Sequence, residues 1–281
     1  MKVLVTGVKG QLGHDVLRAL QSRNMECLGA DIEEFDITDA KAASAFIKNY
    51  RPGAVVHCSA YTAVDKAEDD RERCMAVNSG GARNIAAVCS EIDAKIVYIS
   101  TDYVFPGMGS GEYGVDDPTG AVNIYGKSKL DGELAVRELT RKHFIVRTSW
   151  VFGKNGNNFV KTMLRLGKER SEVNVVCDQV GSPTYTADLA ELLCDMVETE
   201  KYGTYHATNE GFCSWAEFAQ EIFRLAGYPA KVNPIPTSEY PAWAARPKNS
   251  RLSKKSLDDA GFKRLPPWQD ALARYLEEIG V

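Results

Sequence analysis

The sequence has no apolar run that approaches the roughly 20 residues a membrane-spanning helix needs. Its first residues, MKVLVTG, lead directly into a predicted strand and lack the long apolar region of a signal peptide. Internal repeats and low-complexity tracts are also missing, which excludes a repeat architecture. We therefore expect a cytoplasmic protein without a membrane partner.

An excess of basic charge is lacking as well. The net charge is −4, and charged residues make up 26% of the chain. Proteins that bind nucleic acid or anionic membrane surfaces usually carry a basic excess, so neither partner is expected. The hydrophobic fraction of 44% is ordinary for a globular protein, and small polar molecules are the expected partners.

Paired cysteines are absent too. The seven cysteines are an odd number, lie far apart and form no C-x-x-C pair, so we expect reduced thiols. No histidine stands at a spacing that would suggest a catalytic cysteine. The four histidines are scattered, and His57, on a predicted strand, is interpreted as a core residue.

Short β-branched runs alternate with amphipathic segments through the first half of the chain. The predicted strands are residues 2–6, 26–31, 54–60, 95–101 and 143–149. Strands that are apolar on both faces, alternating with helices, indicate an α/β fold with a Rossmann-type doubly wound parallel sheet. We expect a dinucleotide-binding domain over 1–149. Residues 150–281, richer in Gly, Asn and Pro loops, should form a smaller, mixed substrate-binding part whose chain can cross back to the sheet.

A glycine loop follows the first predicted strand. TGVKGQLG places Gly7, Gly10 and Gly13 in the pattern G-x-x-G-x-x-G ahead of a helical run. Glycines let the backbone turn tightly and approach a pyrophosphate, and the helix N-terminus offers free N–H groups to that anion. An ordinary strand-to-helix turn is the structural alternative.

Later strand ends carry residues suited to the rest of a dinucleotide. Asp31 ends the second predicted strand, where a carboxylate can accept hydrogen bonds from the adenosine ribose. Asp36 and Ile37 form a candidate cradle for adenine, whereas Asp39 is interpreted as a helix N-cap. After the third strand, small Ala60 next to Tyr61 and Thr62 suits a backbone that lies against the cofactor.

Tyr125 and Lys129, in NIYGKSKLDGE, stand four residues apart and therefore share one helix face. A phenol with a pKa near 10 is a weak acid, and a neighbouring ammonium would stabilise its phenolate and lower that pKa. Thr101, at the end of the fourth predicted strand, could orient a carbonyl oxygen while Tyr125 protonates it. Taken alone, Tyr125 could equally be a surface aromatic.

The glycine loop, Thr101 and the Tyr125-x-x-x-Lys129 pair together resemble the extended short-chain dehydrogenase/reductase family. The resemblance implies a Rossmann fold, NADH or NADPH as cofactor, Tyr125 as proton donor and Lys129 as a ligand of the nicotinamide ribose. The residues expected to bind the cofactor are Gly7, Gly10, Gln11, Leu12, Gly13, Asp31, Asp36, Ile37, Ala60, Tyr61, Thr62, Ile99, Tyr125 and Lys129.

Members of this family epimerise, dehydrate or reduce nucleotide sugars. One position in the sequence helps to distinguish between these reactions. Dehydratases typically carry an Asp-Glu pair directly after the active-site threonine, whereas Thr101-Asp102 is followed here by Tyr103. Reduction is therefore favoured. The chain resembles nucleotide-sugar reductases of the family through six segments: STDYVF, IYGKSKLDGE, VRTSWVFG, NNFVKTM, DQVGSPTYTADLA and ARPKNSRLS.

This closer resemblance implies reduction of the 4-keto group of dTDP-4-dehydro-L-rhamnose to dTDP-L-rhamnose, in nucleotide-sugar synthesis for surface polysaccharide. It implies that Thr101, Asp102 and Trp150 contact the sugar; a core aromatic is the alternative for Trp150. Arg246 is a candidate for the substrate diphosphate, because a guanidinium forks onto phosphate oxygens.

Some members bind magnesium at a dimer interface, so a homodimer is compatible with the resemblance. Asp15 stands at the corresponding position, but the second acidic site is unclear, with only Asp188 and Glu191 available. Magnesium therefore stays unassigned. Two rival functions remain open: a non-catalytic dinucleotide-binding subunit similar to the regulatory partner of methionine adenosyltransferase, and a reductase of another nucleotide 4-keto sugar.

Overall fold

A computed structural model describes residues 1–281, and six parallel strands form its central sheet. The strand order is β10-β5-β4-β3-β1-β2. The strands are β1 (Val3–Thr6), β2 (Cys27–Ala30), β3 (Ala54–His57), β4 (Lys95–Thr101), β5 (His143–Thr148) and β10 (Gly203–His206). The predicted α/β fold class and the first five strands are confirmed, with ends that differ by up to three residues.

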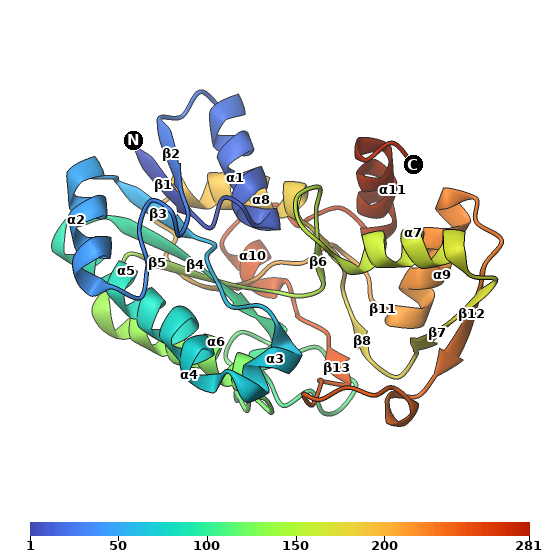
Figure 1. Ribbon diagram of the computed structural model, residues 1–281. Coiled ribbons are helices and arrows are strands. Elements are labelled where there is room, and N and C mark those ends of the chain that lie inside the picture. Colours follow the sequence, from blue (N-terminus) through green and yellow to red (C-terminus); the bar gives the residue numbers. More distant parts are fainter.

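Helices cover both faces of this sheet (Figure 1). α1 (Gln11–Ser22) and α8 (Thr186–Val197) pack together on one face, while α2 (Ala40–Tyr50), α5 (Ala82–Glu91) and α6 (Ile124–Leu139) cover the other. Alternate residues of each strand supply the two cores: Val3 and Val5 face α1 and α8, and Leu4 faces the opposite layer. A period of two is what a strand buried on both faces requires.

Between β3 and β4 the chain forms α3 (Val64–Asp69), α4 (Arg71–Met75) and a π-helical turn, η1 (Ala76–Gly81), which runs directly into α5. A short 3₁₀ turn, η2 (Asp102–Val104), follows β4. The π-helical turn contains Asn78, whose side chain contacts the loop after β3. π-helical turns inside helices frequently occur at functional sites.

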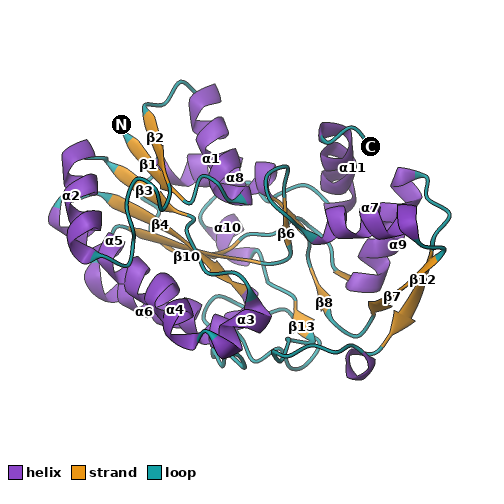
Figure 2. Ribbon diagram, viewed as in Figure 1, coloured by secondary structure: helices purple, strands orange, loops and turns teal.

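The C-terminal half builds a second layer beyond the ends of the strands (Figure 2). Its helices α7 (Phe159–Glu169), α9 (Trp215–Ala226) and α11 (Trp268–Glu278) share a separate core rich in aromatic side chains. Small sheets surround it: β12 (Lys231–Ile235) pairs with β7 (Glu172–Val176), β6 (Val151–Phe152) with β9 (Thr184–Tyr185), and β8 (Val180–Gly181) lies between β11 (Cys213–Ser214) and β13 (Asn249–Ser250). The remaining elements are η3 (Thr237–Glu239) and α10 (Lys255–Asp259).

Segments from beyond residue 150 return to the large sheet. β10 pairs in parallel with β5, α8 packs on α1, and α10 contacts β10. The short, polar sequence of β10 gave no strand signal, because its place at the edge of the sheet is set by pairing with β5 rather than by a hydrophobic pattern. The domain division at 149/150 stays a prediction. None of the helices combines the length and apolar character needed to cross a membrane.

Candidate active site

A cavity of about 830 Å³ lies at the C-terminal ends of the parallel strands, where open α/β sheets bind their ligands. Its walls come from both halves of the chain, from the glycine loop after β1 to Trp215 at the start of α9. The volume is within the usual range of small-molecule sites. Most of the predicted site residues line this cavity: Gly7, Gly10, Gln11, Leu12, Gly13, Asp31, Asp36, Ile37, Ala60, Thr62, Ile99, Thr101, Asp102, Tyr125, Lys129 and Trp150.

The glycine loop requires glycine at two of its positions. Gly7 has a φ of +73°, and a Cβ there would lie 2.7 Å from the backbone nitrogen of Ser59. A Cβ on Gly13 would lie 2.3 Å from the carbonyl oxygen of Gly7. α1 begins directly after Gly10 without a side-chain cap, so its first N–H groups remain available to an anion.

A loop from the C-terminal half holds the glycine loop in place. Asn155 Nδ2 donates to the carbonyl oxygen of Lys9 at 2.7 Å. Gln11 Oε1 accepts hydrogen bonds from Gly153 N at 2.9 Å and from Asn158 Nδ2 at 3.0 Å. Residues 153–158, in the part of the chain expected to be rich in loops, therefore hold in place the glycine loop that should bind the pyrophosphate.

Asp31 lies just past β2, and each of its carboxylate oxygens accepts a hydrogen bond from a nearby backbone N–H group. It accepts hydrogen bonds from the backbone N–H groups of Lys9, at 3.0 Å, and Ile32, at 2.9 Å. The Lys9 ammonium pairs with the exposed Glu33 carboxylate. Asp31 thus faces the cavity as a fixed negative charge, while Lys9 is already engaged.

Thr101 and Asp102 form a hydrogen-bonded unit at the end of β4. Thr101 Oγ1 donates to Asp102 at 2.9 Å and accepts from the N–H of Tyr103 at 3.2 Å. Ser250, on β13, donates to the other Asp102 oxygen. Burial raises the pKa of Asp102 to about 6, although these hydrogen bonds lower it. Because Asp102 holds the Thr101 proton, Thr101 must rotate before it can donate to a carbonyl oxygen.

Tyr125 and Lys129 project into the cavity from α6, whose N-terminus is fixed by Asn123 as a side-chain cap. Burial raises the pKa of Tyr125, and the neighbouring Thr101 hydroxyl acts in the opposite direction. Burial lowers the pKa of Lys129 to about 7, against the attraction of Glu133. The expected lowering of the Tyr125 pKa is therefore wrong, because desolvation dominates and the phenol keeps its proton.

Trp150 is held in an unusual backbone conformation, with a φ of +49°. Left-handed backbone is strained for a bulky residue, and such strain occurs most often where function demands it. Its indole stacks on Trp215 with ring centroids 3.6 Å apart, and both rings line the cavity. Trp150 also packs against the aromatic core of the second layer. The same side chain therefore lines the cavity and belongs to the core.

Two of the predicted residues lie outside the cavity lining. Tyr61 packs in a small cluster against α4 and α6, and its backbone is held by Asn78, which donates to its carbonyl oxygen and accepts from its N–H. Arg246 forms a bidentate ion pair with Asp65, at 2.7 and 3.0 Å, and its guanidinium is directed at that carboxylate. Both placements depend on contacts between segments distant in sequence.

The structure also adds residues that the sequence did not single out. Trp215 lies more than sixty positions from Trp150, and no motif marks it beyond the capping box at the start of α9. The sequence had noted Tyr103 only as the residue that replaces a glutamate, and here its ring packs edge to face on Tyr125 with ring centroids 5.5 Å apart. Asn78 links Tyr61 to α6, because its side-chain amide donates to the hydroxyl of Ser128 at 2.9 Å. These contacts join residues that are far apart in the sequence, so they can be seen only in the folded chain.

The acids considered for magnesium each have other partners. Asp15 accepts a hydrogen bond from Thr186, Asp188 forms a bidentate pair with Arg274 at 2.8 Å, and Glu191 pairs with Arg23. No group of three or more His, Cys, Asp or Glu side chains is placed to hold a metal ion. His57 is buried in the sheet, where its Nδ1 contacts the hydroxyl of Thr6 at 2.8 Å.

The chain was also compared with known proteins. Residues 1–281 match the RmlD substrate binding domain family. The spore coat polysaccharide biosynthesis protein SpsK of Bacillus subtilis is 41% identical over 99% of this chain and 97% of its own. A dTDP-4-dehydrorhamnose reductase of Aggregatibacter actinomycetemcomitans is 40% identical over 96% of this chain and 97% of its own. The crystal structure of dTDP-4-dehydrorhamnose reductase from Bacillus anthracis in complex with NADP superposes with a TM-score of 0.96, at 46% identity and 99% coverage of each chain.

The raised pKa of Asp102 predicts a pH-dependent effect of Asp102→Asn on stability. Because the folded protein holds this proton more tightly than the unfolded chain, the group stabilises the fold at low pH, and that contribution disappears as the pH rises through about 6. Asparagine cannot ionise and avoids this loss. The stability of the variant relative to wild type should rise by about 2 kcal/mol between about pH 4 and pH 8.

Chemical denaturation of both proteins across this pH range measures the difference. Asp116→Asn is the matched control, since Asp116 is exposed and should give a difference that stays constant with pH. A constant difference for Asp102→Asn as well would mean that its carboxyl group titrates normally.

Proposed function

The chain belongs to the RmlD substrate binding domain family, and we propose that it reduces the 4-keto group of dTDP-4-dehydro-L-rhamnose to dTDP-L-rhamnose with NADH or NADPH. One observation carries the proposal: Thr101, Tyr125 and Lys129 face a single cavity together with a glycine loop shaped for a pyrophosphate. The relatives that are similar to this chain over nearly its whole length include dTDP-4-dehydrorhamnose reductases. This confirms the predicted resemblance to nucleotide-sugar reductases.

The cavity fits a nicotinamide dinucleotide. Gly7 and Gly13 leave no room for a Cβ, the uncapped start of α1 offers N–H donors to a pyrophosphate, and Asp31 offers a carboxylate to the adenosine ribose. When bound, the reduced dinucleotide supplies the hydride. Lys129, which lines the same cavity, would hold the nicotinamide ribose.

Reduction of a keto carbon needs one proton in addition to the hydride, and Tyr125 is placed to supply it. Burial raises the pKa of its phenol, so the proton is present at neutral pH. The proton passes from the phenol to the carbonyl oxygen, and the phenolate left behind lies on the same helix face as the Lys129 ammonium. Thr101 can orient the same oxygen once it rotates away from Asp102.

The surroundings of Thr101 favour reduction over dehydration. Elimination of water needs an additional acid and base near the sugar. Tyr103 stands where dehydratases of the family carry glutamate, and its ring packs edge-on against Tyr125. The one nearby carboxylate, Asp102, is held by Thr101 and Ser250. The site therefore has the single proton donor that reduction needs.

Tyr125→Phe tests the proton donor and, with it, the function. The variant should lose about a hundred- to ten-thousandfold in kcat, the usual contribution of general acid catalysis, while its dinucleotide Kd changes little. Oxidation of NADH or NADPH, dependent on the dTDP-4-keto sugar, measures the rate, and NMR of the product identifies the sugar.

Tyr50→Phe is the matched control, because Tyr50 lies on α2, far from the cavity, and its hydroxyl has no hydrogen-bond partner. A wild-type protein that binds the dinucleotide but turns over no 4-keto sugar would support the regulatory-subunit alternative. A different reduced product would support a reductase of another sugar.

Trp150→Ala tests the substrate contact. The variant should raise KM for the sugar nucleotide far more than KM for the dinucleotide, with a loss of about 1–3 kcal/mol of binding for a packed aromatic anchor. Trp268→Ala is the control, since Trp268 belongs to the same core but does not line the cavity. Trp268→Ala should lower Tm without a selective effect on either KM; the same outcome for Trp150→Ala would make Trp150 a core residue only.

Asp31 governs the finer choice between the two cofactors. Its carboxylate would repel the 2′-phosphate of NADPH, which favours NADH, and the Lys9 ammonium that could offset this repulsion pairs with Glu33. We expect activity with both cofactors, with NADH at least equal.

Asp31→Ala should shift the preference toward NADPH, because the variant removes the like charge. Steady-state kinetics of wild type and variant with each cofactor measure the ratio of their kcat/KM values. A wild type that strongly prefers NADPH, together with a variant of unchanged preference, would show that Asp31 does not contact the ribose.

A further inference from the structure

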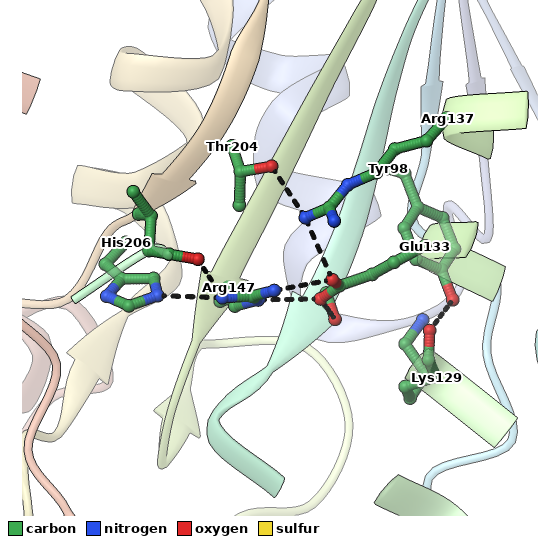
Figure 3. A network of polar contacts seen from close by, with 9 residues as sticks. Tyr98, Lys129, Glu133, Arg137, Arg147, Thr204 and His206 are labelled. Carbon is green, nitrogen blue, oxygen red and sulfur yellow. Dashed lines mark hydrogen bonds and ion pairs between the residues drawn. The ribbon is translucent and has the colours of Figure 1, made fainter. Parts of the chain in front are cut away.

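Behind the cavity wall lies a buried ion pair between Glu133 of α6 and Arg147 of β5 (Figure 3). The exposed fractions of the two residues are 0% and 1%. Arg147 donates through Nε and Nη2 to the two carboxylate oxygens, each at 2.8 Å. Ser100 Oγ donates to the same carboxylate at 2.5 Å. An unpaired buried charge would be strongly destabilising, so the pair persists only as a whole.

This network joins the elements that carry the reacting groups. Glu133 stands one turn beyond Lys129 and two turns beyond Tyr125 on the same face of α6. Ser100 directly precedes Thr101 on β4. Arg147 also contacts His206 of β10, with Nη1 3.3 Å from Nε2, and donates to the carbonyl oxygen of Val115 at 3.0 Å. Glu133 therefore connects the helix of the proton donor to the strand of the catalytic hydroxyl.

Lys129 is a buried cation without an ion-pair partner of its own. Its Nζ lies 4.2 Å from the centre of the Tyr98 ring, on β4, and the Tyr98 hydroxyl donates to its carbonyl oxygen at 3.2 Å. The titratable groups around the ammonium come from four parts of the chain: Tyr125 and Glu133 of α6, Tyr98 of β4, Cys74 of α4, and His57 at the end of β3 with Cys58 directly after it. Glu133 is the one carboxylate among them, and the guanidinium groups of Arg147 and Arg137 that pair with it are the neighbouring cations.

We propose that Glu133 is a positioning residue for the reduction: held by Arg147 and Ser100 one helical turn from Lys129, its carboxylate keeps the Lys129 ammonium charged beside Tyr125. This inference rests on the proposed function, since it assigns a role in that reaction. The fixed geometry carries it: Ser100 and Arg147 from two strands, together with Arg137 of α6 at 3.5 Å, orient a carboxylate that no solvent reaches. That carboxylate lies one helical turn from Lys129. Because no solvent reaches the Glu133 carboxylate, its charge acts on Lys129 with little screening by water.

The direction of the effect follows from the charges. Burial lowers the pKa of Lys129 to about 7, and Glu133 is the largest influence that raises it. Without that carboxylate, the ammonium would lose its proton at lower pH. Activity that needs the charged lysine would then decline at lower pH than in wild type.

Glu133→Gln keeps the size and hydrogen-bonding capacity of the side chain and removes its charge. The basic limb of the kcat/KM profile should move down by about one pH unit. NADH binding, followed by fluorescence titration over the same pH range, should show a shift of the same sign, because Lys129 holds the nicotinamide ribose. The binding measurement needs no turnover, so a wild type without reductase activity would overturn the proposed function and leave the inference testable.

Arg147 would be left buried and unpaired in Glu133→Gln, and the variant could fail to fold. The double variant Glu133→Gln/Arg147→Met replaces the whole pair by neutral groups, a change that buried ion pairs often tolerate. Its basic limb should also move down. Glu133→Asp, which retains the charge, should restore the wild-type limb even if its Tm is lower.

Glu138→Gln is the matched control, because Glu138 lies on the same helix in an exposed pair with Arg83 at 2.9 Å. Its kinetics and pH profile should equal those of wild type. If the charge-neutral Glu133 variants lose stability but retain the wild-type pH dependence of both turnover and NADH binding, Glu133 is only a structural residue and the inference is wrong.

Discussion

Parallel pairing of the six central strands is the constraint on which the rest of this structure depends. Successive parallel strands require a crossover that returns the chain to the same end, so every strand finishes at one edge of the sheet. The glycine loop, Asp31, Ala60 and Thr101 consequently meet at that edge although they are far apart in sequence. Helices must cover both faces, and α6, as one of these helices, carries Tyr125 and Lys129 to the same place.

Burial determines the chemistry of the groups gathered there. It raises the pKa of Tyr125 and of Asp102 and lowers that of Lys129, in each case because a charge is less stable away from water. The phenol therefore remains protonated, as a proton donor must, and the lysine charge depends on its surroundings. The Glu133–Arg147 pair links α6 to β4 and β5 through full charges that the interior tolerates only together.

The C-terminal half contributes to the same cavity by contact rather than by extending one long element. Asn155, Asn158 and Gly153 hold the glycine loop, Ser250 holds Asp102, and Trp215 supports the strained Trp150. β10 pairs with β5 and α8 packs on α1, so the two halves of the chain are in direct contact. The cavity therefore has walls from both layers of the protein.

The sequence by itself determined the α/β class, five of the six sheet strands and the glycine-loop and Tyr125/Lys129 part of the cavity, because these depend on local signals. Buried strands need continuous apolar runs, a tight turn needs Gly7, and a four-residue spacing places Tyr125 and Lys129 on one helix face. Only the tertiary structure decided the partners of each polar group: Asp65 for Arg246, Asn78 for Tyr61, Trp215 for Trp150 and Arg147 for Glu133. It also decided the pKa values, since desolvation depends on what the rest of the chain packs around a group, and no local pattern encodes that.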